Sequence, residues 1–147
     1  MSIGNKIPIF VLLFVLSLFA CHEPSGMAEV VHIIDGDTVV IEGGHHIRYL
    51  GIDAPEKSES YYLEAIRANK ELVKGKKVRL EKDVSDKDKY GRLLRYVYVD
   101  GIFVDAEMVR QGYACAKAYP PDVKYLVYLE AVEKEARCEG RGIWGQK

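Results

Sequence analysis

The sequence contains little cysteine, no excess of basic side chains and no apolar run of membrane-spanning length. Three cysteines occur among 147 residues, and their spacing matches no zinc-binding pattern, which argues against a structural zinc. The 21 basic side chains are balanced by 22 acidic ones, so no global positive field favours a role in packaging nucleic acid. The apolar run at residues 9–19 is shorter than the roughly 18 residues that a membrane-spanning helix requires.

That apolar run follows Lys6 and precedes Ala20 and Cys21, which is the arrangement of a signal peptide. Leu18 fits poorly at the −3 position of ordinary secretory cleavage. Residues 18–21 instead resemble a bacterial lipoprotein signal, in which Cys21 would be the lipidated first residue of the mature chain. The alternative is a cysteine that merely follows the signal of a secreted or periplasmic protein.

These features predict three segments: a signal peptide at residues 1–20, a tether at 21–28 and one compact domain at 29–147. Lipid on Cys21 would attach that domain to a membrane outside the cytoplasm. Removal of the signal takes away Lys6 and no acid, which leaves 20 basic and 22 acidic side chains and a net charge of −2. Affinity for a polyanion must therefore come from a local patch or a bound cation.

Two cysteines remain within the predicted domain, Cys115 and Cys138. In an exported protein such an even pair can form a disulfide. The alternative is two unpaired cysteines buried as small apolar side chains. The sequence leaves both open.

Short β-branched segments and a few amphipathic ones alternate along the rest of the chain. Strands are expected at residues 30–34, 38–41, 46–52, 77–81, 94–99, 102–104 and 113–119. Helices are expected from about 62 to 73, from an N-cap at Asp105 to Gly112, and over 123–137. We therefore predict an α+β fold, a five-stranded OB-fold-like β-barrel with about three helices.

Carboxylates and arginines are concentrated in two regions of this pattern. Residues 35–38, Asp-Gly-Asp-Thr, form one predicted turn, and Arg48, Asp53 and Glu56 follow within the next predicted strand and its end. Arg92 lies in the charged loop at 83–92. Carboxylates bind hard cations and guanidinium groups match phosphate oxygens, so this set indicates metal-assisted hydrolysis of a phosphodiester.

Each of these residues also has an ordinary structural explanation. An Asp-Gly-Asp sequence is often only a turn, and Arg48 could pair with a carboxylate on the neighbouring strand. Glu56 could cap the helix that follows, and Arg92 could be a solvated loop charge. All four explanations would have to hold together to remove the enzymatic interpretation.

The motifs D-G-D-T, R-x-x-x-x-D-x-P-E and D-K-Y-G-R, in this order and spacing, resemble the staphylococcal nuclease (thermonuclease) family. Later segments, M-V-R-Q-G-Y, Y-P-P-D-V-K-Y and G-I-W, are similar to the same family, so the resemblance covers residues 29–144. Each motif is weak alone, and the specificity comes from three motifs in register.

The resemblance implies a role for each residue of the two clusters. Asp37 and Asp53 would bind one Ca²⁺ ion together with the backbone carbonyl of Ala54. Asp35 would support them from outside the ligand shell, or bind the ion through water. Glu56 would be the general base. Arg48 and Arg92 would bind the phosphate oxygens.

Substrate contacts follow from the same resemblance. Lys89 and Tyr90 match the pair that touches a terminal phosphate, and Tyr119 matches an aromatic residue near the nucleotide. Lys117 stands where the family pattern has a second tyrosine, so this chain departs from the family at that position. We expect Lys117 either to contact phosphate or to be an ordinary surface lysine.

Two functions from different classes are consistent with these residues. The first is an exported, monomeric, calcium-dependent nuclease that cleaves DNA and RNA and, by resemblance, leaves 3′-phosphates. The second is a non-catalytic nucleic-acid- or protein-binding module on the same fold. The presence of all five site residues, Asp37, Arg48, Asp53, Glu56 and Arg92, favours the enzyme.

Overall fold

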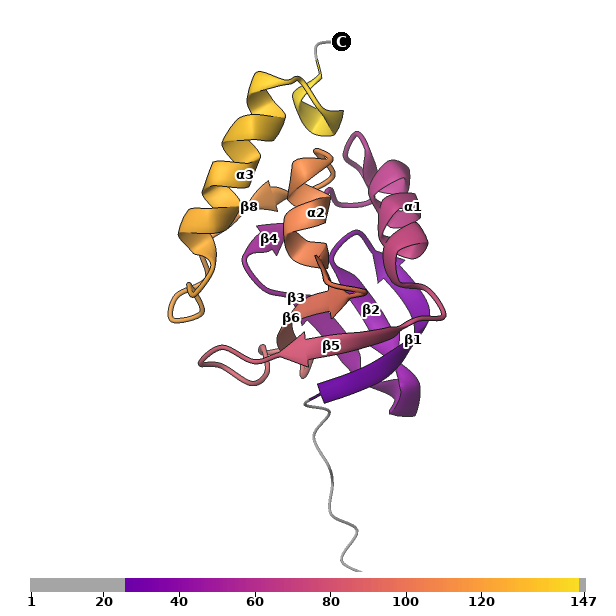
Figure 1. The fold of residues 1–147 in the computed structure, drawn as a ribbon. Coiled ribbons are helices and arrows are strands. Elements are labelled where there is room, and N and C mark those ends of the chain that lie inside the picture. Colours follow the sequence, from indigo (N-terminus) through magenta and orange to yellow (C-terminus); the bar gives the residue numbers. More distant parts are fainter. Residues whose placement is uncertain (1–25, 146–147) are drawn as a thin grey trace, which may run out of the picture.

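Five strands close into a barrel in the computed structural model, which describes residues 26–145 (Figure 1). Neighbouring strands are antiparallel except at the seam, where β3 pairs with β6 in parallel and closes the sheet. The predicted α+β fold, a five-stranded OB-fold-like barrel with three helices, is confirmed. The barrel strands, in spatial order around the sheet, are β3 (His46–Tyr49), β2 (Thr38–Ile41), β1 (Gly26–Asp35), β5 (Lys77–Glu81) and β6 (Leu93–Val99).

Alternation of β-branched side chains explains the inside of the barrel. Val30 of β1, Val39 and Ile41 of β2, and Ile47 of β3 are fully buried, while residues between them face outward. Successive side chains of a strand point to opposite faces, so this spacing gives each strand one apolar face. The buried faces together form one continuous core.

Three helices and several short elements complete the domain. Figure 1 shows α1 (Tyr62–Val73) and α3 (Leu126–Cys138) on opposite sides, with α2 (Val104–Arg110) between them. Helix α3 turns Leu129, Val132 and Ala136 inward at the spacing of an amphipathic helix. The short elements are β4 (Ile52–Asp53), β7 (Ile102–Phe103), β8 (Cys115–Ala116) and two 3₁₀ turns, η1 (Glu42–Gly44) and η2 (Gly142–Trp144).

The expected strand at 46–52 is interrupted at Leu50 and Gly51, which separates β3 from β4. Gly51 has φ +74°, and a Cβ there would lie 2.5 Å from a methyl carbon of Leu129. Only glycine adopts this backbone without strain and leaves room for that side chain. The interruption redirects the chain, so Asp53 lies in β4 and pairs with β8.

Asp105 is not the N-cap of α2, as the sequence suggested. The cap position is Phe103, so Asp105 already lies inside the first turn of the helix. Its side chain is fully buried and accepts a hydrogen bond from the backbone N–H of Val97 at 2.9 Å. Burial raises the pKa of this carboxyl well above its ordinary value.

Two other elements differ from their expected bounds. Strand β8 covers only two residues of the strand expected at 113–119. Helix α3 begins at Leu126, three residues later than expected.

Strand β1 begins at Gly26 and pairs with β5 from that residue onward, so residues 26–28 of the predicted tether belong to the barrel. The predicted signal peptide and Cys21 lie outside the described residues. Within residues 26–145, no helix has the length and apolar character needed to cross a bilayer.

Cys115 and Cys138 are both free, so the candidate disulfide does not form. Cys138 follows the buried Ala136 by two positions, which places it about 200° around α3, on the outer face. Cys115 lies on β8, paired with Asp53 of β4. The two cysteines therefore lie on different elements, with Cys138 on the outer face of its helix.

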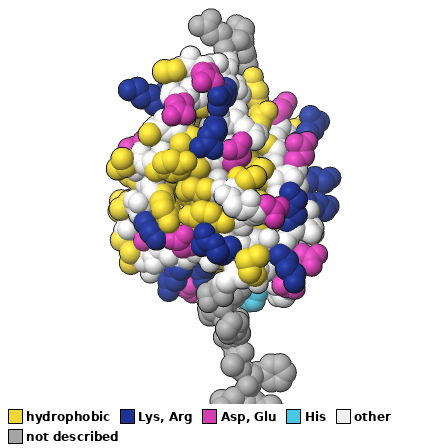
Figure 2. Space-filling view, in the orientation of Figure 1, with side chains coloured by type: hydrophobic (Ala, Val, Ile, Leu, Met, Phe, Trp, Pro, Cys, Tyr) yellow, Lys and Arg dark blue, Asp and Glu magenta, His cyan; other side chains and the backbone are white. Residues whose placement is uncertain are grey.

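Aromatic side chains gather on one outer face of the domain. Figure 2 shows hydrophobic side chains clustered over the first half of α3 and its neighbours, with Lys and Arg side chains around them. The rings of Tyr98 and Phe103 stack at 4.7 Å between centroids, and Tyr128 lies parallel to Phe103 at 6.2 Å. Most of these rings contact other rings, which is the packing role expected for aromatic pairs.

Candidate active site

The turn between β1 and β2 holds Asp37 in place. Gly36 is packed so closely that a Cβ there would lie 2.7 Å from the Cβ of Ala54 and 2.8 Å from that of Ala65. The carboxylate of Asp37 accepts hydrogen bonds from the N–H of Ala54 at 2.8 Å and the hydroxyl of Thr38 at 3.0 Å. Asp35 accepts the N–H of Asp37 at 3.2 Å, so it supports Asp37 through the backbone.

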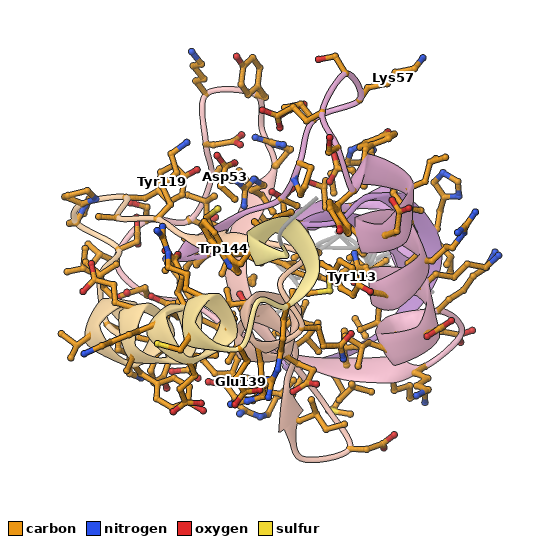
Figure 3. The ribbon with its side chains drawn as sticks, turned by 90° about the horizontal axis from the view of Figure 1, so that it is seen from above. Asp53, Lys57, Tyr113, Tyr119, Glu139 and Trp144 are labelled. Carbon is orange, nitrogen blue, oxygen red and sulfur yellow. The ribbon has the colours of Figure 1, made fainter. Side chains whose placement is uncertain are left out.

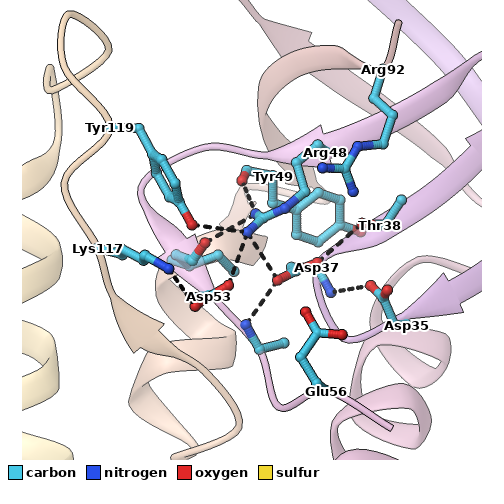
Figure 4. Close-up of polar contacts among 12 residues, drawn as sticks. Asp35, Asp37, Thr38, Arg48, Tyr49, Asp53, Glu56, Arg92, Lys117 and Tyr119 are labelled. Atoms are coloured by element: carbon cyan, nitrogen blue, oxygen red, sulfur yellow. Dashed lines mark hydrogen bonds and ion pairs between the residues drawn. The ribbon is translucent and has the colours of Figure 1, made fainter. Parts of the chain in front are cut away.

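Arg48 is the centre of the cluster (Figure 4). It lies opposite Thr38 in the β2–β3 register, which turns its side chain toward Asp37. Its Nη2 is 3.2 Å from Asp37 Oδ2 and 3.2 Å from Asp53 Oδ1, so one nitrogen joins both predicted ligands. Its Nη1 donates to the carbonyls of Tyr49 at 2.5 Å and Ile52 at 3.0 Å. The guanidinium is thus buried and fixed at several points.

Glu56 lies on the loop that follows β4, and its carboxylate points toward the region of Asp35 and Asp37 in Figure 4. Its backbone N–H donates to the carboxylate of Glu59 at 2.6 Å, which fixes the loop. The Glu56 side chain is exposed and makes no hydrogen bond or ion pair with any of residues 26–145. Of the four predicted carboxylates, Asp35, Asp37, Asp53 and Glu56, it is therefore the one whose oxygen atoms form no hydrogen bond or ion pair with another described residue.

Arg92 approaches from the other side of Arg48 because β6 starts at Leu93, beside Ile47 of β3. Asp88 holds it: one carboxylate oxygen accepts Nε of Arg92 at 2.7 Å and the other accepts its backbone N–H at 3.0 Å. A cavity of about 200 Å³ lies between the two arginines. Its lining includes both arginines and three predicted substrate residues, Lys89, Tyr90 and Tyr119.

Lys117 does not line that cavity. Its ammonium lies 2.8 Å from Asp53 Oδ2, while Arg48 contacts the other oxygen of the same carboxylate.

Asp53 and Tyr119 lie on one side of the molecule and Glu139, at the end of α3, on the opposite side (Figure 3). The hydroxyl of Tyr119 is 3.3 Å from Arg48 Nη2, which brings the loop after β8 against the cluster.

Burial raises the pKa of Asp37 to about 6, because desolvation outweighs the attraction of Arg48 and the hydrogen bond from Ala54, and Asp35 adds repulsion. Between pH 3.8 and about 6 the folded protein therefore holds a proton that the unfolded chain has released. In the presence of a chelator, we expect the contribution of Asp37 to the free energy of unfolding to fall by on the order of 3 kcal/mol as the pH rises through this interval.

This expectation is checked by urea unfolding at a series of pH values, with Asp37→Asn as the comparison. The difference in unfolding free energy between the two proteins should change with pH in this interval and be constant above it. A constant difference throughout would contradict the assignment. A bound divalent cation would oppose the effect, because it favours the ionised carboxylate.

The donor set around Arg48 is chemically suited to a hard cation. It consists of the carboxylates of Asp37 and Asp53 and the backbone carbonyl of Ala54, the residue whose N–H donates to Asp37. All three groups offer oxygen ligands. Among the described residues, no three His, Cys, Asp or Glu side chains gather into a ready-made metal centre. Water and substrate oxygens would therefore have to complete the shell. His45 and His46 are exposed at a turn and bring no ligand to it.

One polar residue that supports Asp35 was not identified from the sequence. Asn69 is fully buried, donates to the carbonyl of Asp35 at 2.9 Å and accepts the hydroxyl of Tyr49 at 2.8 Å. It ties α1 to the turn that carries Asp37. A signal was present, because Asn69 occupies the buried stripe of α1, four residues after Ala65 and four before Val73.

A second supporting set fixes the loops that carry Arg92 and Tyr119. Arg95 is 1% exposed and pairs with Asp86 at 2.7 Å, which anchors the loop before β6. Asp122 accepts the backbone N–H groups of Val84 and Ser85 at 3.0 and 2.7 Å, so it joins that loop to the one after β8. Asp122 lies 38 and 37 residues from its two partners, and Arg95 lies nine residues from Asp86, so no local pattern indicates these contacts.

Comparison with known proteins gives the same assignment over most of the chain. Residues 46–146 match the family model described as staphylococcal nuclease homologue. The thermonuclease of Staphylococcus intermedius is 36% identical over 124 residues, covering 78% of this chain and 74% of the relative. An uncharacterized endonuclease of Haemophilus influenzae is 38% identical over 148 residues, covering 97% of this chain and 80% of the relative.

The SPbeta prophage-derived endonuclease YokF of Bacillus subtilis is 40% identical over 124 residues, covering 77% of this chain. The chain spans only 42% of that relative's length. The activity of the longer relative therefore does not transfer to this chain without further argument.

Proposed function

Since the chain belongs to the staphylococcal nuclease family, we propose that it is a calcium-dependent nuclease that hydrolyses phosphodiester bonds of DNA and RNA. The observation that carries this proposal is the position of Arg48. The same side chain contacts both acidic residues suited to a cation and faces, across a cavity of about 200 Å³, a second arginine held by Asp88. Phosphate would bind in that space, beside the acidic residues that would hold the cation.

The chain's own residues would divide the work as follows. Asp37, Asp53 and the carbonyl of Ala54 would hold the calcium ion, which when bound neutralises phosphate charge and orients the reacting groups. Arg48 and Arg92 would donate paired hydrogen bonds to phosphate oxygens and stabilise the charge that grows in the transition state. The free carboxylate of Glu56 would accept the proton of the attacking water.

The lining of the cavity supports a nucleotide substrate. Tyr90 is 72% exposed at its rim, and Lys89 lies 5.1 Å from the centroid of that ring, so a cation and an aromatic face are offered together. Stacking on aromatic rings is tolerant of sequence, which suits a nuclease without base specificity. We propose that cleavage leaves 3′-phosphates, as the family resemblance implies.

We further propose that the domain acts as a monomer outside the cytoplasm, anchored by lipid on Cys21, or released as a secreted or periplasmic form. Weak calcium sites built from few carboxylates are used where calcium is abundant, as it is outside the cytoplasm. Export would also separate a nonspecific nuclease from the genome of its own cell. The anchor is tested by metabolic labelling with palmitate followed by membrane fractionation. We expect labelled protein in the membrane fraction, and loss of both the label and the membrane association in Cys21→Ser.

The activity is tested by incubating the purified protein with single-stranded DNA and, separately, with RNA across a calcium series. We expect release of acid-soluble nucleotides from both substrates and complete loss of release when calcium is chelated. A folded protein that cleaves neither substrate with calcium present would contradict the proposal. Retained binding to single-stranded DNA in that case would favour the alternative, a non-catalytic binding module on the same fold.

A further inference from the structure

Lys117 is placed against a predicted calcium ligand instead of against substrate. Its backbone N–H donates to the carbonyl of Gly51 at 2.8 Å, which fixes it beside β4. Its ammonium lies 2.8 Å from Asp53 Oδ2. A tyrosine, the residue that the family pattern predicts here, has no positive charge to offer that carboxylate.

The two cationic contacts of Asp53 differ in how easily they can be given up. Arg48 touches Asp53 Oδ1 with the same nitrogen that touches the buried Asp37, and its other nitrogen is bonded to two carbonyls. That contact is fixed by the fold. The Lys117 side chain is 50% exposed and that of Asp53 is 36% exposed. An ion pair of this kind is held weakly and is open to competition.

We propose that Lys117 competes with calcium for Asp53, so that this chain binds calcium more weakly than it would with a neutral residue at position 117. The inference rests on the proposed function, because it takes Asp53 as a calcium ligand. Calcium binding would displace the ammonium from Asp53 Oδ2. The freed ammonium already lies 5.4 Å from the ring centroid of Tyr119, a residue of the cavity between the two arginines. It would then add a positive charge at that cavity, whose lining already includes Arg48, Arg92 and Lys89.

The proposal is tested by calorimetric titration of calcium into the protein without nucleic acid. Lys117→Met removes the charge and keeps an unbranched side chain, and we expect it to tighten the calcium dissociation constant by about two- to five-fold. Lys117→Arg keeps the charge and should remain close to the unaltered protein. The gain in Lys117→Met should shrink at high salt, because salt screens the competing ion pair.

Lys124→Met is the matched control. Lys124 is 51% exposed and pairs with Glu81, so the variant makes the same change in net charge at a position away from Asp53. We expect its calcium affinity to match that of the unaltered protein. Equal tightening in Lys124→Met would show a general effect of net charge and would overturn the proposal.

Unchanged or weakened calcium binding in Lys117→Met, with the thermal unfolding midpoint preserved, would overturn the proposal while leaving the nuclease assignment intact. Tighter binding in Lys117→Met by a protein that cleaves no nucleic acid would support the competition and count against the nuclease. Absence of calcium binding in both proteins would overturn both.

Discussion

Glu56→Gln is expected to reduce kcat by about 10²- to 10⁴-fold, the range associated with loss of a general base. Glutamine has nearly the same shape as glutamate but cannot accept a proton from water near neutral pH. The carboxylate of Glu56 makes no other hydrogen bond or ion pair with the described residues, so its loss should leave the fold unchanged. The measurement is initial-rate cleavage of single-stranded DNA at saturating calcium and substrate.

Calcium affinity and thermal stability should be nearly unaltered in Glu56→Gln. These two measurements distinguish the loss of a general base from a structural disruption of the site. Glu64→Gln makes the same chemical change on the exposed face of α1 and should retain full activity. A Glu56→Gln protein with unaltered kcat would show that another group accepts the proton.

Arg92→Ala is expected to lower kcat by about 10²- to 10³-fold, as removal of other preorganised donors to a developing charge does. Asp88 aligns this guanidinium through Nε, which leaves its two terminal nitrogens for phosphate in a residue that lines the cavity. Arg92→Lys should recover little of the loss, because a lysine presents one point charge and no paired donors.

The loss should appear in kcat more than in KM, because the contact strengthens as negative charge develops. Arg79→Ala is the control, since Arg79 is an exposed arginine stacked on Tyr98 at 3.9 Å, outside the residues that line the cavity. Equal losses in both variants would indicate a nonspecific electrostatic effect. Arg48 is less suitable for this test, because its removal would leave the buried carboxylate of Asp37 unpaired, at a cost of about 3–5 kcal/mol in stability.

Local patterns were sufficient to predict the barrel and the residues of the cluster. The spacing of Val30, Val39, Ile41 and Ile47 predicted strands with one buried face, and these strands form. Asp100 and Gly101 predicted a tight turn, and both have positive φ, 49° and 78°, in the turn between β6 and β7. Strand alternation and tight turns depend only on residues that are close together in the sequence, so both can be predicted from it.

Contacts between distant segments could not be predicted from local sequence patterns. The pairing of β4 with β8 decides that Lys117 meets Asp53 and that Cys115 lies opposite Asp53. Arg95 looked like an ordinary strand residue, yet it is buried and anchors a loop through Asp86. Burial of an arginine requires a partner that the tertiary structure places beside it. The periodicity of apolar residues in the sequence does not indicate that partner.

The parallel seam between β3 and β6 has a consequence for the newly made chain. Helix α1 and strand β5 lie between these two strands in sequence, so the seam can form only after a long loop has closed, at an entropic cost. Arg48 and Arg92 come together only across that seam. An incompletely folded chain would therefore lack the assembled pair of arginines. If the chain is exported unfolded, as the proposed localisation implies, the proposed phosphate site would be absent while the chain remains beside its own genome.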